Sequence, residues 1–140
     1  MKGVYYGLRF VFPMMKEKGG SIIITSSVAG ISGTPNVLIY VTSKHALIGM
    51  VRSAALEGAS YKICVNTNNP SPVDNPMMRS LEEGFAPGQG DAAKQNFEQS
   101  IPLGGYATNE EVAKLAMFLA GDDSKFITGT VNPIDGGMTA

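Results

Sequence analysis

The chain has 140 residues, of which 44% are hydrophobic and 16% are charged, a composition typical of one soluble globular domain spanning residues 1–140. Eleven basic and twelve acidic side chains leave a net charge of −1, which argues against nucleic acid and anionic membrane surfaces as partners. No apolar stretch reaches the ~20 residues of a membrane span. Lys2, Arg9 and Pro13 interrupt the first fifteen residues, which disfavours a signal peptide or an anchor.

The single cysteine, Cys64, lies in the apolar run KICVN and has no partner for an internal disulfide. This fits a reducing compartment, and we expect a cytoplasmic protein in which Cys64 is a small buried hydrophobic side chain. The eight methionines are not accompanied by a cluster of His, Cys and Asp. We therefore expect no metal site and expect the methionines to fill the core and a loop.

The first predicted element is a helix over residues 1–18 with two apolar faces. Val4, Leu8, Val11 and Met15 form one stripe, and Tyr6, Phe10 and Met14 form the other. Such a helix must be covered on one side by a sheet and on the other by a further element, for which a helix of a second subunit is one candidate. Pro13 predicts a kink or an early end, and Gly19-Gly20 stops the helix.

A strand is predicted at residues 21–27, because SIIITSS is the continuous β-branched run of a parallel strand covered on both faces. A loop rich in glycine and proline leads into a helix over about residues 39–57, which again has two apolar faces. A second strand covers residues 62–70 and ends at Pro70.

Residues 71–105 are rich in proline and glycine, which predicts a mobile excursion with one or two short helices. A helix with Asn109 as its cap is predicted over residues 109–124, with Glu110 and Glu111 in its first turn. Residues 129–137 form a last short strand. This alternation of elements predicts an α/β fold with helices layered on a parallel sheet.

Tyr40 and Lys44 are one helical turn apart, so both project from the same face of the second predicted helix. An ammonium about 4 Å from a phenol favours the phenolate by on the order of 4 kcal/mol at an effective dielectric near 20, but by only about 1 kcal/mol in bulk water. The pair is therefore either an acid/base couple in a partly water-excluded cleft or an ordinary pair on a solvated helix face.

Ser27 is the last residue of the first predicted strand, thirteen residues before Tyr40. The carboxyl ends of parallel strands are where open α/β sheets place their ligands. A hydroxyl at that place either donates to a bound carbonyl group or completes the hydrogen bonding of the strand.

Together these stretches resemble the short-chain dehydrogenase/reductase family, over essentially all 140 residues. The matching pieces are GGSIIITSSVAG, the serine thirteen residues before Tyr40, YVTSKHAL, VNTNNPSPVDNPM and GTVNPIDGG. The resemblance implies an incomplete doubly wound, Rossmann-like parallel sheet with flanking helices. It also implies catalytic roles for Ser27, which would polarise a substrate carbonyl, Tyr40, which would exchange the proton, and Lys44, which would stabilise the phenolate and hold the nicotinamide ribose.

The same resemblance implies NAD or NADP as cofactor. It assigns cofactor contacts to Tyr40, Lys44, Pro70, Ser71, Val73 and Asn75. Two positions differ from the family pattern. Ser71 stands where a glycine is usual, which would strain the turn or crowd the cofactor, and Asn75 stands where a threonine is common, which changes the reach of the hydrogen-bonding group.

The 140 residues contain no glycine-rich turn between a first strand and its helix, although a dinucleotide needs one. By resemblance, roughly the first half of a doubly wound fold lies outside this chain. Two functions stay open. One is an NAD(P)-dependent oxidoreductase that interconverts a secondary alcohol and a ketone. The other is a non-catalytic remnant that associates through helices 1–18 and 39–57, with itself as a homo-oligomer or with a full-length relative.

His45 follows Lys44 and on a helix points about 100° away from the Tyr40–Lys44 pair, so we expect no catalytic role for it. Asp135-Gly136-Gly137 predicts a turn near a subunit contact.

Overall fold

The computed structural model describes all 140 residues and contains a parallel three-stranded sheet in the order β1-β2-β3. In chain order, the elements are α1 (Lys2–Met15), β1 (Gly20–Thr25), η1 (Val28–Gly30), α2 (Leu38–Gly58), η2 (Ala59–Tyr61), β2 (Ile63–Pro70), α3 (Pro76–Phe85), α4 (Gly90–Gln99), α5 (Asn109–Ala120), η3 (Asp122–Ser124) and β3 (Val131–Ile134). The predicted α/β class with a parallel sheet is confirmed.

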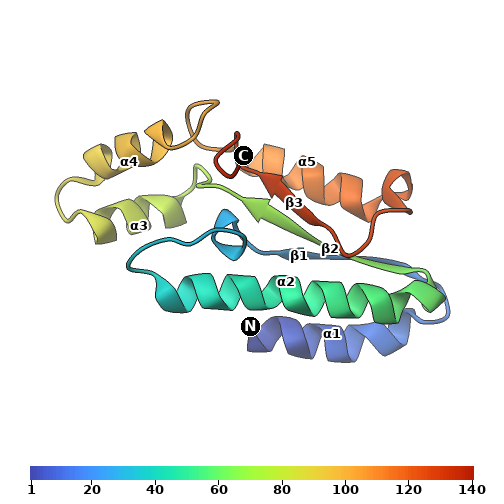
Figure 1. Cartoon of the computed structure of the whole chain (residues 1–140). Helices are drawn as coiled ribbons and strands as arrows, with labels where there is room; N and C mark the ends of the chain where they lie inside the picture. Colours follow the sequence, from blue (N-terminus) through green and yellow to red (C-terminus); the bar gives the residue numbers. More distant parts are fainter.

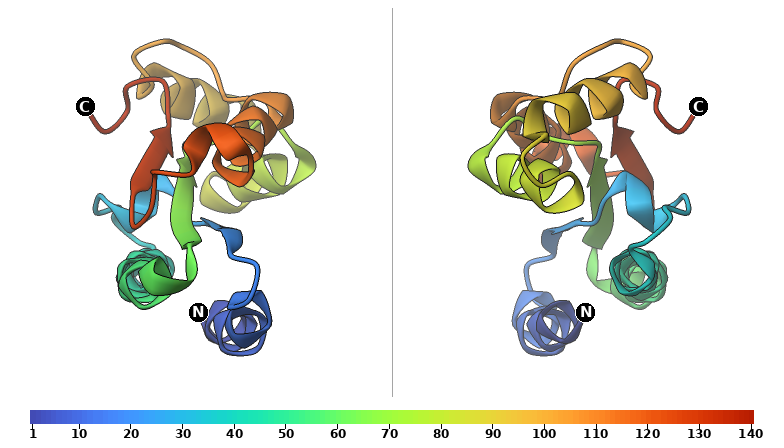
Figure 2. Two further views of the ribbon diagram at one scale, coloured as in Figure 1. Left: turned by 90° about the vertical axis from the view of Figure 1, so that its right-hand side faces the viewer. Right: turned by 90° about the vertical axis from the view of Figure 1, so that its left-hand side faces the viewer.

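The helices form a layer on each face of the sheet. Helices α1 and α2 lie side by side on one face, and α5 lies on the other (Figures 1 and 2). Helices α3 and α4 pack on each other beyond the carboxyl end of β2 (Figure 1). The excursion predicted for residues 71–105 therefore carries two short helices at the edge of the sheet where ligands bind in α/β folds.

The hydrophobic core lies between α2 and the sheet. Strand β2 occupies the centre of the sheet, and seven of its eight residues are buried, the half-buried Cys64 being the exception. The prediction of a buried Cys64 is therefore only partly met. The buried core side chains are Ile24, Leu47, Val51, Ala54, Ala55, Ile63 and Val65.

Helix α1 contacts this core through one stripe only. Val4, Leu8, Phe12 and Met15 pack against the core cluster, but no residue of the helix is fully buried. Phe12 takes the inward place predicted for Val11, which is 45% exposed. The second predicted stripe, Tyr6, Phe10 and Met14, is exposed. The helix passes Pro13 and ends two residues later, as the prediction of an early end required.

Strand β1 is less buried than its sequence predicts. Ile24 is its only buried residue, and the strand ends at Thr25 rather than at Ser27. The reason is its position at the edge of the sheet, because a strand with one neighbour leaves its outer side open. Both faces of β1 are nevertheless covered in part, since α5 contacts the strand and Val4 and Leu8 of α1 lie beside its isoleucines.

The start of α5 also differs from its prediction. Thr108, not Asn109, is the N-cap, because its hydroxyl accepts a hydrogen bond from the Glu111 amide and the Glu111 carboxylate accepts one from the Thr108 amide. The two reciprocal hydrogen bonds between Thr108 and Glu111 form a capping box. At its other end the helix stops at Ala120, and residues 122–124 form the separate turn η3.

The prediction that methionines fill the core holds for some of the eight. Met78 is buried and Met15 and Met50 pack against the core cluster, whereas Met1, Met14, Met77 and Met117 are exposed. No group of three His, Cys, Asp or Glu side chains lies close enough to hold a metal ion, and no helix is both long and apolar enough to cross a membrane.

Candidate active site

A cavity of about 410 Å³ lies at the carboxyl end of β2, between α2, α3, α4 and α5. The seven site residues predicted from the sequence all line it. They are Ser27, Tyr40, Lys44, Pro70, Ser71, Val73 and Asn75. Groups up to 48 residues apart in the sequence are thus brought to one place.

Ser27 lies two residues beyond β1 and has an extended backbone. Its hydroxyl oxygen accepts a hydrogen bond from the Ala29 amide at 3.1 Å and so caps the short helix η1. This contact uses an acceptor position of the hydroxyl and leaves its O–H free to donate. Both roles considered for Ser27 are therefore compatible, since the capping contact does not use the proton.

Lys44 is tied to the end of β1. Its Nζ donates to the backbone oxygens of Ser26 at 3.0 Å and of Thr25 at 3.3 Å. The Ser26 hydroxyl donates in return to the Lys44 backbone oxygen at 3.1 Å. The ammonium lies 5.5 Å from the ring centroid of Tyr40. These contacts fix the α2 side chains relative to Ser27.

Tyr40 lies in the first turn of α2 and is 48% exposed. The charge argument needs a partly water-excluded cleft around the Tyr40–Lys44 pair. About half of the Tyr40 side chain remains exposed to solvent, so water is excluded from the pair only in part.

Gly30 allows η1 to approach α2 closely. A Cβ atom at this position would lie 2.5 Å from the Ser26 hydroxyl oxygen and 3.1 Å from the Lys44 backbone oxygen. The absence of a side chain at Gly30 therefore preserves the hydrogen bond between Ser26 and Lys44.

Two buried polar side chains of β2, Thr67 and Asn69, form a hydrogen-bonded relay that ends on the Ser27 backbone oxygen. The Thr67 hydroxyl donates to Asn69 Oδ1 at 2.6 Å, and Asn69 Nδ2 donates to the Ser27 backbone oxygen at 2.8 Å. Both side chains are fully buried. Sequence reasoning missed this relay, although NTNN in a strand expected to be buried was the pattern that could have revealed it, because buried polar groups need partners.

The stretch from Pro70 to Asn75 forms the wall next to the strand ends. Ser71 is buried, its amide donates to the Ile134 oxygen, and its backbone does not have the positive φ that would favour glycine. The strain expected there is absent. Asn75 caps α3 by accepting a hydrogen bond from the Met78 amide at 3.1 Å. Val73 pairs with Ala107, which holds this stretch beside the start of α5.

Two other sequence features lie outside the cavity. His45 is exposed and its Nδ1 contacts the Val41 backbone oxygen. The buried Asp135 carboxylate accepts hydrogen bonds from the amides of Gly137 and Thr139. The turn predicted at residues 135–137 is present and is organised by Asp135.

Most of the apolar lining of the cavity was not predicted. It comes from α3, α4, α5 and the C-terminal turn, whose sequences show no motif that links them to Ser27. These side chains are Met77, Met78, Leu81, Phe97, Val112 and Met138.

A family model described as enoyl-(acyl carrier protein) reductase matches residues 1–139. Trans-4-hydroxycyclohexanecarboxylate dehydrogenase of Sinomonas cyclohexanicum is 39% identical over 140 residues, which cover 100% of this chain and 49% of that protein. The 3-oxoacyl-(acyl-carrier-protein) reductase FabG of Thermotoga maritima is 40% identical over 139 residues, which cover 99% of this chain and 53% of that protein.

Solved structures give the same result. Levodione reductase superposes with a TM-score of 0.95 at 35% identity, over 98% of this chain and 54% of that chain. An NAD⁺-bound xylitol dehydrogenase and ElxO with NADP bound superpose with TM-scores of 0.88 and 0.85, each at 32% identity. The chain spans about half the length of the relatives it matches. It belongs to the short-chain dehydrogenase/reductase family of oxidoreductases and aligns with the C-terminal half of its relatives.

Proposed function

We propose that the chain carries the acid/base and substrate-binding part of an NAD(P)-dependent oxidoreductase that interconverts a secondary alcohol and a ketone. The observation that carries this proposal is the convergence of Ser27, Tyr40 and Lys44 on one cavity with the stretch from Pro70 to Asn75. The free O–H of Ser27 and the fixed position of Lys44 beside Tyr40 support it. We also propose a cytoplasmic location, which the free thiol of Cys64 supports.

In the reduction direction, the Ser27 hydroxyl donates a hydrogen bond to the substrate carbonyl oxygen, since its proton is not used within the chain. Tyr40 gives its phenolic proton to the same oxygen. Lys44 stabilises the resulting phenolate by its charge, and its position is fixed by the backbone oxygens of residues 25 and 26. Oxidation of the alcohol uses the same groups in reverse.

The nicotinamide cofactor supplies the hydride when it is bound. Lys44 and Tyr40 would hold its ribose hydroxyls, and the stretch of residues 70–75, including Val73, would contact the carboxamide. Lys44 retains one N–H donor after its two contacts to the strand end, because an ammonium has three. These residues fit the nicotinamide half of a dinucleotide, and the 140 residues contain no glycine-rich turn for the pyrophosphate.

The test is a titration of the chain with NADH and with NADPH, read by nucleotide fluorescence and by calorimetry. We expect binding, and we expect Tyr40→Phe to retain it while losing ketone reduction, because the phenylalanine keeps the ring and removes the proton. Tyr5→Phe, on the exposed part of α1, is the matched control and should retain both. Absence of a signal with either nucleotide at millimolar concentration would contradict an enzymatic role for the 140-residue chain.

A second candidate function is association without catalysis, through α1 and α2. Two observations favour it. The stripe of Tyr6, Phe10 and Met14 is exposed, and a groove of about 810 Å³ runs between the two helices, lined by Leu8, Phe12 and Met50 among others. We propose a homo-oligomer that buries this surface. Sedimentation of the unmodified chain and of Phe10→Glu tests this proposal. We expect the unmodified chain to sediment as an oligomer and Phe10→Glu, which places a charge at the centre of the stripe, to sediment as a monomer. Equal sedimentation of the two chains would contradict the proposal.

A further inference from the structure

The part of the cavity lining that comes from α3 and α4 is apolar. We propose that this site takes an uncharged, largely apolar ketone or secondary alcohol and rejects carboxylate- or phosphate-bearing ones, with the side chains of α3 and α4 as the specificity determinants. This inference rests on the proposed oxidoreductase function and names its substrate class. The wall side chains are Met77, Met78, Leu81 and Phe97, with Val112 and Met138 beside them.

Lys44 is the only ionised side chain in the cavity lining. Two of its three donors are already bonded to the end of β1, and it lies beside Tyr40. It therefore belongs to the reacting end of the site. The remaining polar lining, which includes Thr34, Ser71 and Asn109, is neutral and cannot balance a buried anion. A carboxylate bound against the wall would lose its hydration without a counter-charge.

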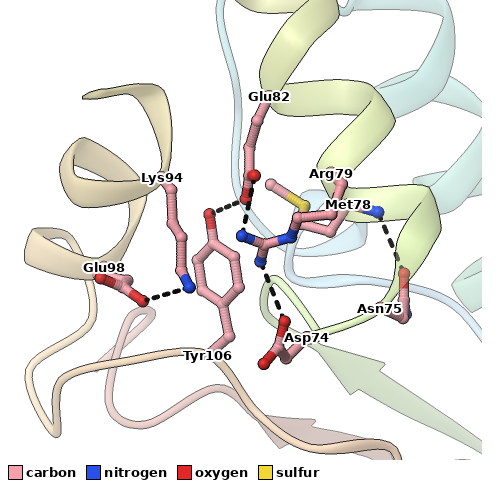
Figure 3. Close-up of polar contacts among 8 residues, drawn as sticks. All are labelled: Asp74, Asn75, Met78, Arg79, Glu82, Lys94, Glu98 and Tyr106. Carbon is pink, nitrogen blue, oxygen red and sulfur yellow. Dashed lines mark hydrogen bonds and ion pairs between the residues drawn. The ribbon is translucent and has the colours of Figure 1, made fainter. Parts of the chain in front are cut away.

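Two charged residues of α3, Arg79 and Glu82, form a cluster with Asp74 (Figure 3). Arg79 pairs with Asp74 at 3.1 Å and with Glu82 at 3.1 Å. The Glu82 side chain is 3% exposed, so its charge is balanced inside the protein rather than by solvent. The guanidinium that could otherwise have received an anionic substrate is thus neutralised by two carboxylates, and Arg79 is not part of the cavity lining.

Tyr106 is also part of this cluster, because it contacts both Glu82 and Arg79. Its hydroxyl donates to Glu82 Oε1 at 2.7 Å, and its ring lies 5.3 Å from the Arg79 guanidinium carbon (Figure 3). Burial and the hydrogen bond to Glu82 raise the pKa of Tyr106 well above its usual value, so the phenol remains a neutral donor. On α4, Lys94 pairs with Glu98 at 3.7 Å. The cations of both helices, Arg79 and Lys94, are thus each paired with a carboxylate.

The apolar wall is both adaptable and held in place. Methionine side chains are flexible and polarisable, so they accommodate apolar groups of different shape. The helices that carry them are joined by an edge-to-face contact between Phe85 and Phe97, with ring centroids 5.9 Å apart. We therefore infer tolerance toward the shape of the substrate and intolerance toward its charge.

The test uses a matched pair of ring ketones that differ in charge, 4-methylcyclohexanone and 4-oxocyclohexanecarboxylate. The chain is labelled with ¹³C at its methionine methyl groups and titrated with each ketone by NMR. Met77, Met78 and Met138 line the cavity, whereas the other five methionines do not and serve as internal controls. We expect the neutral ketone to shift the three cavity signals and to bind at least about tenfold more tightly than the carboxylate.

Leu81→Arg supplies the missing cation on the half-exposed face of α3, where Leu81 is 45% exposed. We expect it to narrow or invert the preference, and Leu56→Arg, on an exposed part of α2 outside the cavity, to leave it unchanged. Equal or tighter binding of the carboxylate to the unmodified chain overturns the proposal. Failure of the neutral ketone to move the three cavity signals also overturns it.

These outcomes are separate from those of the proposed function. Ketone binding at the three cavity methionines without nucleotide binding would remove the oxidoreductase role of this chain and leave the apolar site. Nucleotide binding with preference for the carboxylate would retain the oxidoreductase role and remove the inferred substrate class.

Discussion

Strands β1 and β2 are direct neighbours, and the more polar of the two is the more buried. β1 reads GSIIIT and has one buried residue, whereas β2 reads ICVNTNNP and has seven. Composition alone would reverse this order. The difference is one of position, because β2 has a strand on each side and a helix on each face, and β1 has a strand on one side only. Burial of a strand is therefore decided by its neighbours, and buried polar residues in a central strand have specific partners.

Ile23 of β1 and Asn66 of β2 are partners in the strand register. We expect the largest loss of stability when the polar member of this pair is replaced by an apolar residue. Asn66 donates to the Ile127 oxygen and accepts from the amide and hydroxyl of Thr130. Asn66→Val leaves these groups without partners, and we expect a loss of about 3 kcal/mol in the free energy of unfolding. We expect the half-buried control Ile23→Thr to cost about 1 kcal/mol. Urea unfolding followed by circular dichroism measures both.

An equal or smaller loss for Asn66→Val than for Ile23→Thr would contradict the comparison. It would mean that apolar content, rather than satisfied hydrogen bonding, decides the stability of the central strand.

The next effect concerns the relay behind Ser27. Asn69→Ala removes the donor to the Ser27 oxygen and the acceptor for Thr67, and we expect it to cost about 2 kcal/mol. Thr67→Val removes only one of these bonds and should cost about 1 kcal/mol. Because both act through Asn69, the double variant should cost less than the sum of the two. Additive losses in a double-mutant cycle would show that the relay is not a unit.

A smaller loss of stability is expected from a change at the start of α5, which packs on the sheet. Thr108→Ala removes the N-cap hydroxyl, and we expect a loss of about 1 kcal/mol in the free energy of unfolding. Thr108→Ser keeps the hydroxyl and should restore most of it. A loss as large as that for Asn66→Val would place the end of α5, rather than the centre of β2, among the main determinants of stability.

The smallest effect depends on pH. The backbone hydrogen bond from Thr108, followed by its side-chain hydrogen bond, lowers the pKa of Glu111 below its usual value of 4.5. A carboxyl with a lowered pKa in the folded state stabilises the fold above its unfolded pKa, and this contribution is lost as the pH falls through the folded value. Glu111→Gln should therefore be less stable than the unmodified chain at pH 7 and equal to it at low pH. A difference that persists in acid would assign the effect to helix propensity.

The sequence predicts well what depends on local pattern. The alternation of apolar periods identifies α1, α2, α5 and the three strands, and the spacing of Ser27, Tyr40 and Lys44 identifies three side chains that line one cavity. These succeed because helix and strand periods are local properties, and because the carboxyl ends of neighbouring parallel strands meet at one edge.

What the sequence could not predict depends on neighbours remote in the chain. Three isoleucines predict a fully buried β1, but its place at the edge of the sheet leaves most of the strand only half-buried. The contact of Tyr106 with Glu82 spans 24 residues, and no periodicity links the two. The same holds for the methionines of the wall, since α3 and α4 are short and their packing direction is set by tertiary contacts.

The outer side of β1 presents a row of backbone donors and acceptors beside Ile22, Ile23 and Ile24, within an apolar groove of about 290 Å³ shared with α1. Such a row can be extended by any stretch of polypeptide that adopts an extended conformation. In a concentrated sample this open edge favours association of chains by strand addition. Lysine at position 23 would discourage intermolecular strand addition and prolong the useful lifetime of the preparation without altering the cavity, since Ile23 does not line it.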